Sequence, residues 1–302
     1  MPHVAYGTPR KLPRAKDLIG RVVVLDIAFA ADSGSATFES VTKKLLDGLG
    51  DRLAMWIDHH DHARHAEFAS DPRFVLATKA QHGACPEMVT KERVLAAGHV
   101  DTVLCHIDFD GLCAAAKWIR GGEEPYPGAD ADAHAVDTRL GTPSPRGAAI
   151  DRALRARPHD DGLRGIVVRF LATGASDTGL WQPIATAASE LESMEEEARR
   201  LARGYRIADH PQRTAEVALV DATTRRTSYD KTYLLLLGQE RARIAVVYDK
   251  TTVTCAARFD SGVNLLEMFD LEGGMPTRVS VARDRLKDVL ARLGVADQLA
   301  VD

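Results

Sequence analysis

The run RVVVLDIAFA at residues 21–30 constrains the fold more than any other stretch of this chain. It is almost entirely apolar and lacks the every-second-residue alternation of a strand with one face in water, so it predicts a strand covered on both faces. Such strands occur mainly in parallel sheets. Three further apolar runs of strand length follow it, at residues 52–60, 73–78 and 100–108.

Segments with helical spacing separate these runs. Phe38, Val41 and Leu45, within residues 36–49, recur at the three- and four-residue spacing of one helix face. Residues 111–120 are rich in alanine, the strongest helix former, and also predict a helix. The alternation of strands and helices predicts an α/β fold, with a parallel sheet and helices on both of its faces.

The rest of the chain predicts a second, smaller domain. Residues 121–165 are rich in Gly, Pro and Asp, and we expect loops there. A charged amphipathic helix at 185–204 would connect two domains. Short apolar runs then predict strands at residues 215–223, 231–238, 242–250 and 252–260, and a helix at 281–294. We therefore expect a parallel-sheet domain at 1–184, a connector helix at 185–204, and an α+β domain at 205–302 across a cleft.

Composition narrows the classes of function. The 302 residues are 45% hydrophobic, enough for two cores, and the formal net charge of -4 predicts no global attraction to nucleic acid. Four cysteines without C-x-x-C spacing predict reduced thiols. No apolar stretch approaches the ~20 residues of a membrane span, and the basic, Pro-interrupted start does not resemble a signal peptide. We expect a cytoplasmic protein without a membrane partner.

Acidic and histidine residues follow three of the predicted strands. They are Asp26, then Asp58, His59 and His60, and finally His106, Asp108 and Asp110. The carboxyl ends of parallel strands meet at one edge of a sheet, where ligands bind. In an extended segment, residues two apart share a face and consecutive residues face opposite ways. We therefore expect the last three side chains on one face, and His59 and His60 on opposite sides.

The carboxylates at this edge require a counter-charge. Two carboxylates about 4 Å apart repel by about 4 kcal/mol at an effective dielectric of about 20. Four of them would cost an energy comparable to the stability of a domain. The alternative, a polar cluster satisfied by hydrogen bonds alone, leaves those charges unpaired. Carboxylate and imidazole ligands without thiolate suit Mn²⁺, Mg²⁺ or Co²⁺ better than a structural zinc ion. Four or more acids suit two ions that share a bridging carboxylate.

The two motifs, D-H-H after an apolar strand and H-x-D-x-D-G entering an Ala-rich helix, together resemble the DHH phosphoesterase superfamily. That family includes single-strand exonucleases, oligoribonucleases, cyclic-dinucleotide phosphodiesterases and a pyrophosphatase. In it H-x-D-x-D usually precedes D-H-H, whereas here it follows, which we interpret as a circular permutation within the sheet. The resemblance implies these roles: His106 and Asp108 bind the first ion, His59 and Asp110 the second, Asp26 bridges both, His60 contacts the phosphate, and Asp58 orients the histidines.

The family pattern also implies a fourth aspartate, and two positions fit it. Asp137 lies in A-V-D-T-R, where Arg139 would be near a phosphate. Asp177 lies in a D-T-G that resembles the last motif of the oligoribonuclease branch. We prefer Asp137, and Asp177 stays the alternative.

Residues 256–281 resemble the DHH-associated substrate-binding domain. That domain carries a glycine-rich loop ending in a histidine, and here Gly273 and Gly274 are followed by Met275 instead. The resemblance implies that these two glycines, with Arg258 and Arg278, contact the substrate.

The sequence thus predicts a hydrolase that uses two divalent cations, foremost Mn²⁺, to cleave phosphoester bonds. Short oligonucleotides and linear or cyclic dinucleotides are the expected substrates. The alternatives are a phosphatase for nucleotide bisphosphates of the 3′-phosphoadenosine 5′-phosphate kind, and a sensor that binds a nucleotide without cleaving it. Assembly as a homodimer is left open.

Overall fold

The computed structural model describes residues 1–31, 36–208 and 216–299, and it divides into two compact units, Met1–Ser189 and Glu190–Asp302. Unit 1 contains a five-stranded sheet in the order β1-β6-β2-β3-β5, in which every strand pair is parallel. Its strands are β1 (His3–Tyr6), β6 (Thr102–Cys105), β2 (Val22–Leu25), β3 (Leu53–Asp58) and β5 (Phe74–Leu76), and a short β4 (Asp61–His62) follows β3.

Both faces of this sheet are buried, as the continuous apolar runs predict. In β2, Val23 and Leu25 pack into the core that contains helix α3 (Phe109–Ile119). Val22 and Val24 face the opposite core, which includes residues of α1 (Lys44–Leu49). All four side chains are fully buried. The predicted fold class, a parallel α/β sheet with helices on both faces, is therefore confirmed for unit 1.

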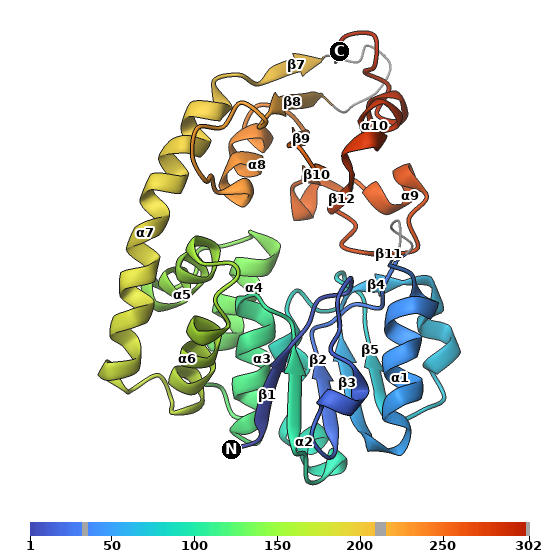
Figure 1. The fold of residues 1–302 in the computed structure, drawn as a ribbon, viewed down its shortest axis with the longest axis vertical. Helices are drawn as coiled ribbons and strands as arrows, with labels where there is room; N and C mark the ends of the chain where they lie inside the picture. Colours follow the sequence, from blue (N-terminus) through green and yellow to red (C-terminus); the bar gives the residue numbers. More distant parts are fainter. Residues whose placement is uncertain (32–35, 209–215, 300–302) are drawn as a thin grey trace. The chain divides into compact units, whose positions relative to one another are not determined.

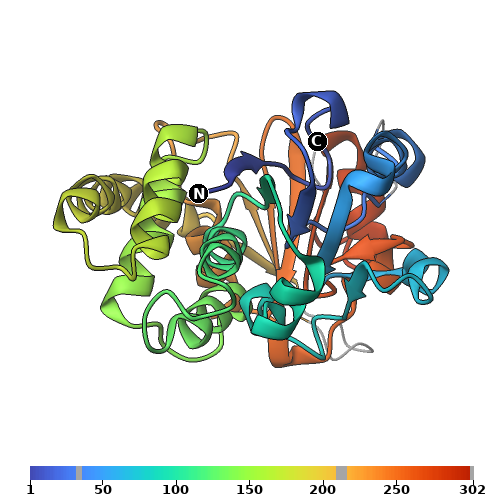
Figure 2. The same cartoon turned by 90° about the horizontal axis from the view of Figure 1, so that it is seen from below.

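The remaining helices of unit 1 include α2 (Lys91–Ala97) and a second layer that packs on α3. This layer comprises α4 (Ala129–Thr138), α5 (Pro145–Ala156) and α6 (Asp161–Ala172), which gather on one side of the sheet in both views (Figures 1 and 2). Helix α7 (Thr178–Ala202) begins in unit 1 and continues into unit 2. Among the helices of the described residues, none combines the length and apolarity needed to cross a bilayer.

Unit 2 is a mainly antiparallel sheet with helices. Its strand order is β12-β10-β9-β8-β7, and only the pair β8–β9 is parallel. The strands are β7 (Arg206–Ala208), β8 (Val217–Asp221), β9 (Ile244–Tyr248), β10 (Thr252–Ala257) and β12 (Arg278–Ala282), with a two-residue β11 (Gly273–Gly274). The helices are α8 (Lys231–Gln239), α9 (Leu265–Phe269) and α10 (Leu286–Arg292). The α+β character predicted for the C-terminal half is confirmed.

Two of the predicted elements are wrong, and local chemistry explains both. Residues 121–165 are largely helical rather than loops, because the Pro and Gly residues there begin or separate helices. Ser144 caps α5 and Pro145 is its first residue, a position that proline favours. Residues 231–238 form helix α8 rather than a strand, since Asp230 caps this leucine-rich run by accepting a hydrogen bond from Tyr233 N.

Candidate metal centre

Three adjacent strands bring the predicted residues to one edge of the sheet in unit 1. Strands β6, β2 and β3 are neighbours and parallel, so their carboxyl ends lie side by side. Asp26 directly follows β2, His59 follows β3, and His106 follows β6. The chain continues from β2 to β3 on one side of β2 and returns to β6 on the other. This is the reversal of strand order at which open α/β sheets bind ligands.

Asp26 is held in an unusual backbone conformation at this edge. Its φ of 59° is left-handed, a region that asparagine and aspartate tolerate better than other residues with a side chain. The side chain is 1% exposed. Its Oδ1 lies 3.0 Å from His59 Nε2, whereas Oδ2 has no hydrogen bond from any described residue. Strained residues of this kind cluster at functional sites.

His59 presents one ring nitrogen to the acids. Its Nδ1 lies 2.9 Å from the backbone oxygen of His82, and because a carbonyl only accepts, Nδ1 carries the proton. Nε2 lies 3.0 Å from Asp26 Oδ1 and 3.1 Å from Asp110 Oδ2, and these acids outweigh burial and the Lys79 charge and raise the pKa of His59 well above its ordinary value. An imidazole fixed in this way by a backbone carbonyl is the usual arrangement of a metal-binding histidine.

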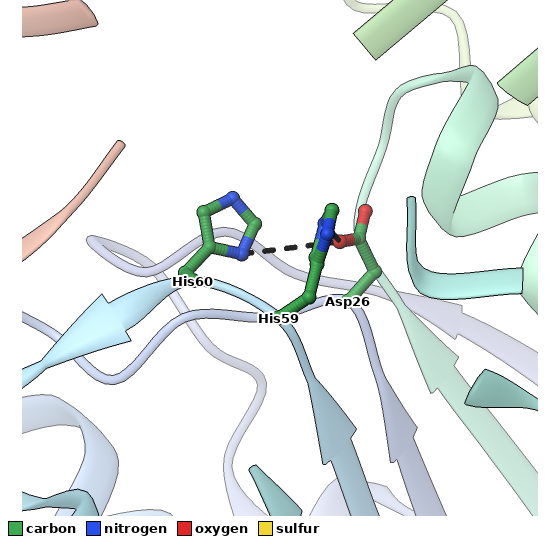
Figure 3. Close-up of side chains that lie close together, drawn as sticks. All are labelled: Asp26, His59 and His60. Carbon is green, nitrogen blue, oxygen red and sulfur yellow. Dashed lines mark hydrogen bonds and ion pairs between the residues drawn. The ribbon is translucent and has the colours of Figure 1, made fainter. Parts of the chain in front are cut away.

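His60 lies on the same side as His59, so the prediction that they face opposite ways is wrong. Their ring centroids are 4.8 Å apart, and both rings lie beside Asp26 (Figure 3). The reason is that β3 ends at Asp58, so the alternation of an extended strand does not apply beyond it. His60 Nδ1 donates to Asp58 Oδ1 at 2.8 Å, which fixes the orientation of the ring.

The H-x-D-x-D-G segment turns from strand into helix, so the alternation of an extended strand, on which the prediction of one shared face rests, does not apply to its three side chains. Asp108 caps α3 by accepting a hydrogen bond from Gly111 N, and Asp110 lies in the first turn. Asp110 accepts from Cys85 N at 3.0 Å. His106 Nδ1 lies 2.8 Å from Asp108 Oδ2 and 3.7 Å from Asp26 Oδ2.

Among the described residues, three groups of ligand atoms result, each with its atoms within 4.8 Å of one another. They are Asp26 with His106 and Asp108, Asp26 with His59 and His60, and His59 with Asp110 and Asp137. Asp137 lies in helix α4, and not in a loop as the composition of residues 121–165 predicts. The alternative, Asp177, is exposed and in none of these groups, and it accepts hydrogen bonds from Gly179 N and Leu180 N at the start of α7.

Lys79 is the residue at this site that the sequence analysis missed. It is 3% exposed, its Nζ lies 2.8 Å from His59 Nε2, and it forms an ion pair with Asp137. The edge rule that selected the other residues also applies to it, because Lys79 closely follows strand β5. The pattern of acids and histidines does not single it out, because a protonated amine is not a metal ligand.

Burial and neighbouring charges shift the pKa of several groups. Burial raises the pKa of Asp26 well above its ordinary value and that of Asp110 to about 6. Burial alone would raise the pKa of Asp58, but the His60 charge outweighs it and lowers that pKa to about 2. Burial would likewise lower the pKa of His106, but Asp108 raises it to about 9. Such opposed shifts within one cluster are typical of functional sites.

The residues at this edge fit a divalent cation. Asp26 Oδ2 is a buried atom without a hydrogen-bond partner among the described residues, although it can bind a cation. His106 Nδ1, which forms an ion pair with Asp108 Oδ2 at 2.8 Å, is a second atom that can bind one. A buried polar atom without a partner costs about 1–3 kcal/mol, so a shared ion would remove a real penalty. The ligand atoms are carboxylate oxygens and imidazole nitrogens, which suit Mn²⁺, Mg²⁺ and similar ions.

The predicted substrate-binding residues have other partners in the structure. Arg139, at the carboxyl end of α4, pairs with Asp151 at 3.3 Å. In unit 2, Arg258 pairs with Asp260 at 2.9 Å, and Arg278 donates to Thr232 at 3.3 Å. Gly273 and Gly274 form β11, with Gly274 at a left-handed φ of 125°. Their contacts with a substrate stay a prediction.

Comparisons with known proteins leave the family unassigned. No protein-family model matches the chain, and no curated protein matches it by sequence. Among solved structures, a Methanococcus jannaschii protein described as a family II inorganic pyrophosphatase matches 97% of this chain and 98% of its own. The identity is 12% and the TM-score 0.23, values too low to carry an argument about fold or activity.

Proposed function

We propose that this chain is a metal-dependent hydrolase that cleaves phosphoester bonds. One observation carries the proposal: buried carboxylates and imidazoles from three adjacent parallel strands converge at the carboxyl edge of the sheet. Asp26 Oδ2 gains no hydrogen bond there from the described residues. A purely structural cluster would satisfy its own polar atoms.

The chain's own residues support this chemistry. A bound divalent ion supplies Lewis acidity, a water of lowered pKa and a template for the phosphoryl group. Asp58 accepts a hydrogen bond from His60 Nδ1, so Nε2 is the nitrogen of His60 that is left to exchange a proton with the reacting group. Burial and the Lys79 charge lower the pKa of His60, so its imidazole is mainly neutral at pH 7.

Short oligonucleotides and linear or cyclic dinucleotides are the proposed substrates, and Mn²⁺ is the proposed metal. The net charge of -4 disfavours electrostatic retention of long nucleic acid. The motif resemblance to the DHH superfamily supports a nucleotide substrate, and a nucleotide bisphosphate is the second choice within the same reaction class.

The test is a substrate panel with the full chain. Dinucleotides, short RNAs, short DNAs, nucleotide bisphosphates and pyrophosphate are each incubated with Mn²⁺, and the products are quantified. We expect one of the nucleotide classes to be consumed, and Asp108→Ala and His59→Ala to lose at least about 100-fold in rate. His99→Ala, at an exposed histidine elsewhere in unit 1, is the control. Turnover that persists without metal, or in both site variants, contradicts the proposal.

A further inference from the structure

The position of Lys79 bears on how many ions the site holds. Its side chain is 2% exposed, so the ammonium group is buried inside the cluster rather than solvated beside it. Nζ lies 2.8 Å from His59 Nε2 and forms an ion pair with Asp137 Oδ2. These two residues belong to the group His59, Asp110 and Asp137, in which a second divalent ion would bind.

An ammonium group and a divalent ion compete for the same atoms in this group. Nε2 is the one ring atom of His59 that a metal could bind, because Nδ1 donates to the oxygen of His82. Lys79 Nζ lies 2.8 Å from Nε2, so the ammonium occupies the position that a metal bound to this atom would take. An ammonium and a divalent ion that both contact His59 and Asp137 would also repel each other strongly in a buried environment. The group therefore holds one of the two cations at a time.

In the group formed by Asp26, His106 and Asp108, no ammonium in the described part of the chain competes with a metal for the ligand atoms. Asp26 Oδ2 has no hydrogen-bond partner among the described residues, and His106 Nδ1 pairs with Asp108 Oδ2, a member of the same group. None of the amines whose contacts are described for this part of the chain pairs with His106 or Asp108. No lysine ammonium has to leave for a divalent ion to bind these three side chains.

We propose that the chain holds a single divalent ion, bound by Asp26, His106 and Asp108, and that the ammonium of Lys79 takes the place of a second ion between His59 and Asp137. The inference rests on the proposed function, since it concerns the same site, and it departs from the two ions predicted from the sequence. A chelator then removes only one of the two cations, because the other is covalently part of the chain.

The test counts manganese ions. The full chain is stripped with a chelator, reloaded with Mn²⁺ and freed of unbound metal, and manganese per chain is measured by elemental analysis. Electron paramagnetic resonance distinguishes an isolated Mn²⁺ from a spin-coupled pair. We expect one ion per chain and the signal of an isolated ion in the native protein. Lys79→Met should bind two ions and show a coupled pair, since methionine keeps most of the apolar stem of lysine but lacks the terminal ammonium group.

Lys117→Met is the matched control. Lys117 is another buried lysine of unit 1, paired with Asp130 and donating to the oxygen of Pro86. Its loss disturbs a comparable buried pair without touching the ligand groups, so this variant should bind one ion. If Lys79→Met does not fold, Asp137→Asn decides: it should retain one ion at unchanged affinity, because Asp137 neutralises Lys79 rather than binding metal.

Two ions in the native protein, or one ion in folded Lys79→Met, would overturn the inference. Loss of the bound ion in Asp137→Asn would do the same. These outcomes are separate from a failure of the proposed function. A native chain that hydrolyses phosphoesters with two bound ions refutes only the role of Lys79, whereas a chain without metal binding or turnover refutes the proposed function itself.

Discussion

Asp26 is the residue on which the candidate centre most depends. It takes part in two of the three ligand groups, and its left-handed backbone places its carboxylate at the end of the central strand. Burial raises its pKa well above the ordinary value, which means that its negative charge destabilises the metal-free fold. A cation bound to Asp26 would therefore also stabilise the fold, because it would neutralise this buried negative charge.

Replacing Asp26 by asparagine separates these two effects. Asparagine tolerates the left-handed conformation and has nearly the same shape, so only the charge is lost. Without metal, Asp26→Asn should raise the free energy of unfolding at neutral pH by on the order of 1 kcal/mol. The stabilisation by Mn²⁺ should disappear. Denaturant titrations with and without Mn²⁺ measure both, and a variant that Mn²⁺ stabilises as much as the native chain would contradict the assignment.

We expect Asp58 to act through His60 rather than on the metal. Its Oδ1 holds His60 Nδ1 at 2.8 Å, and Asp58 belongs to none of the three ligand groups. We expect Asp58→Asn to lower kcat by about 10- to 100-fold with little change in the manganese bound per chain, because the imidazole loses its orientation and tautomer. Steady-state kinetics and elemental analysis test this together. Unchanged kcat would show that Asp58 does not orient His60.

At the level of elements, the strands of unit 1 were predictable and its helical layer was not. Runs such as 21–30 combine continuous apolarity with strand length, and both are local properties of the sequence. Helices α4 and α5 begin among Pro, Gly and Asp residues that also mark loops, so the capping roles of Gly128 and Ser144 were mistaken for loop signals. Strand β1 was missed because it lies in the Pro-interrupted start of the chain.

The same distinction applies to the candidate site. Asp26, His59 and His106 were predictable as neighbours, because each follows a strand and parallel strands end at one edge. Asp137 comes to the cluster only through the packing of α4 on α3, a long-range contact that no local pattern encodes. The pairing of Lys79 with Asp137 depends on that same packing, so the sequence did not indicate it.

Gly111 is required by the tight turn from β6 into α3. A Cβ at this position would lie 2.7 Å from the backbone oxygen of His106, too close for real atoms. Gly111→Ala should therefore lower the free energy of unfolding by about 1–3 kcal/mol and weaken metal binding by displacing His106.

Gly165, within α6, is the matched control for that substitution. The nearest atom to a Cβ there is the Tyr6 hydroxyl at 3.7 Å, an ordinary contact. Gly165→Ala should raise the free energy of unfolding by about 0.5–1 kcal/mol, because alanine is the better helix residue. Equal effects of the two substitutions in denaturant titrations would contradict the steric argument.

At the scale of the whole molecule, the stability of unit 2 should depend on pH in the acidic range. In unit 2, Glu197 is 8% exposed and accepts hydrogen bonds from Arg200 and from Arg226 N. The bonds from Arg200 lower the pKa of Glu197 from 4.5 to about 2. Its stabilisation is thus fully present above pH 4.5 and is lost as the pH falls toward 2. The melting temperature of unit 2 should fall less over this pH range in Glu197→Gln than in the native chain. An equal fall in the variant and the native chain would contradict the stabilising role of the Glu197 carboxylate.

Metal should stabilise unit 1 and leave unit 2 unchanged. A ligand at about 100 times its dissociation constant stabilises the native state by about 2.7 kcal/mol. In calorimetry, Mn²⁺ should raise the melting temperature of unit 1 alone, and the rise should shrink at low pH because protonated ligands do not bind metal. A shift confined to unit 2 would place the metal elsewhere.

The most direct measurement of the central claim is anomalous diffraction from crystals of the full chain grown with Mn²⁺. We predict an anomalous peak within coordination distance of Asp26, His106 and Asp108. Crystals that bind manganese only at surface carboxylates, with no peak at the carboxyl edge of the sheet, would contradict the account.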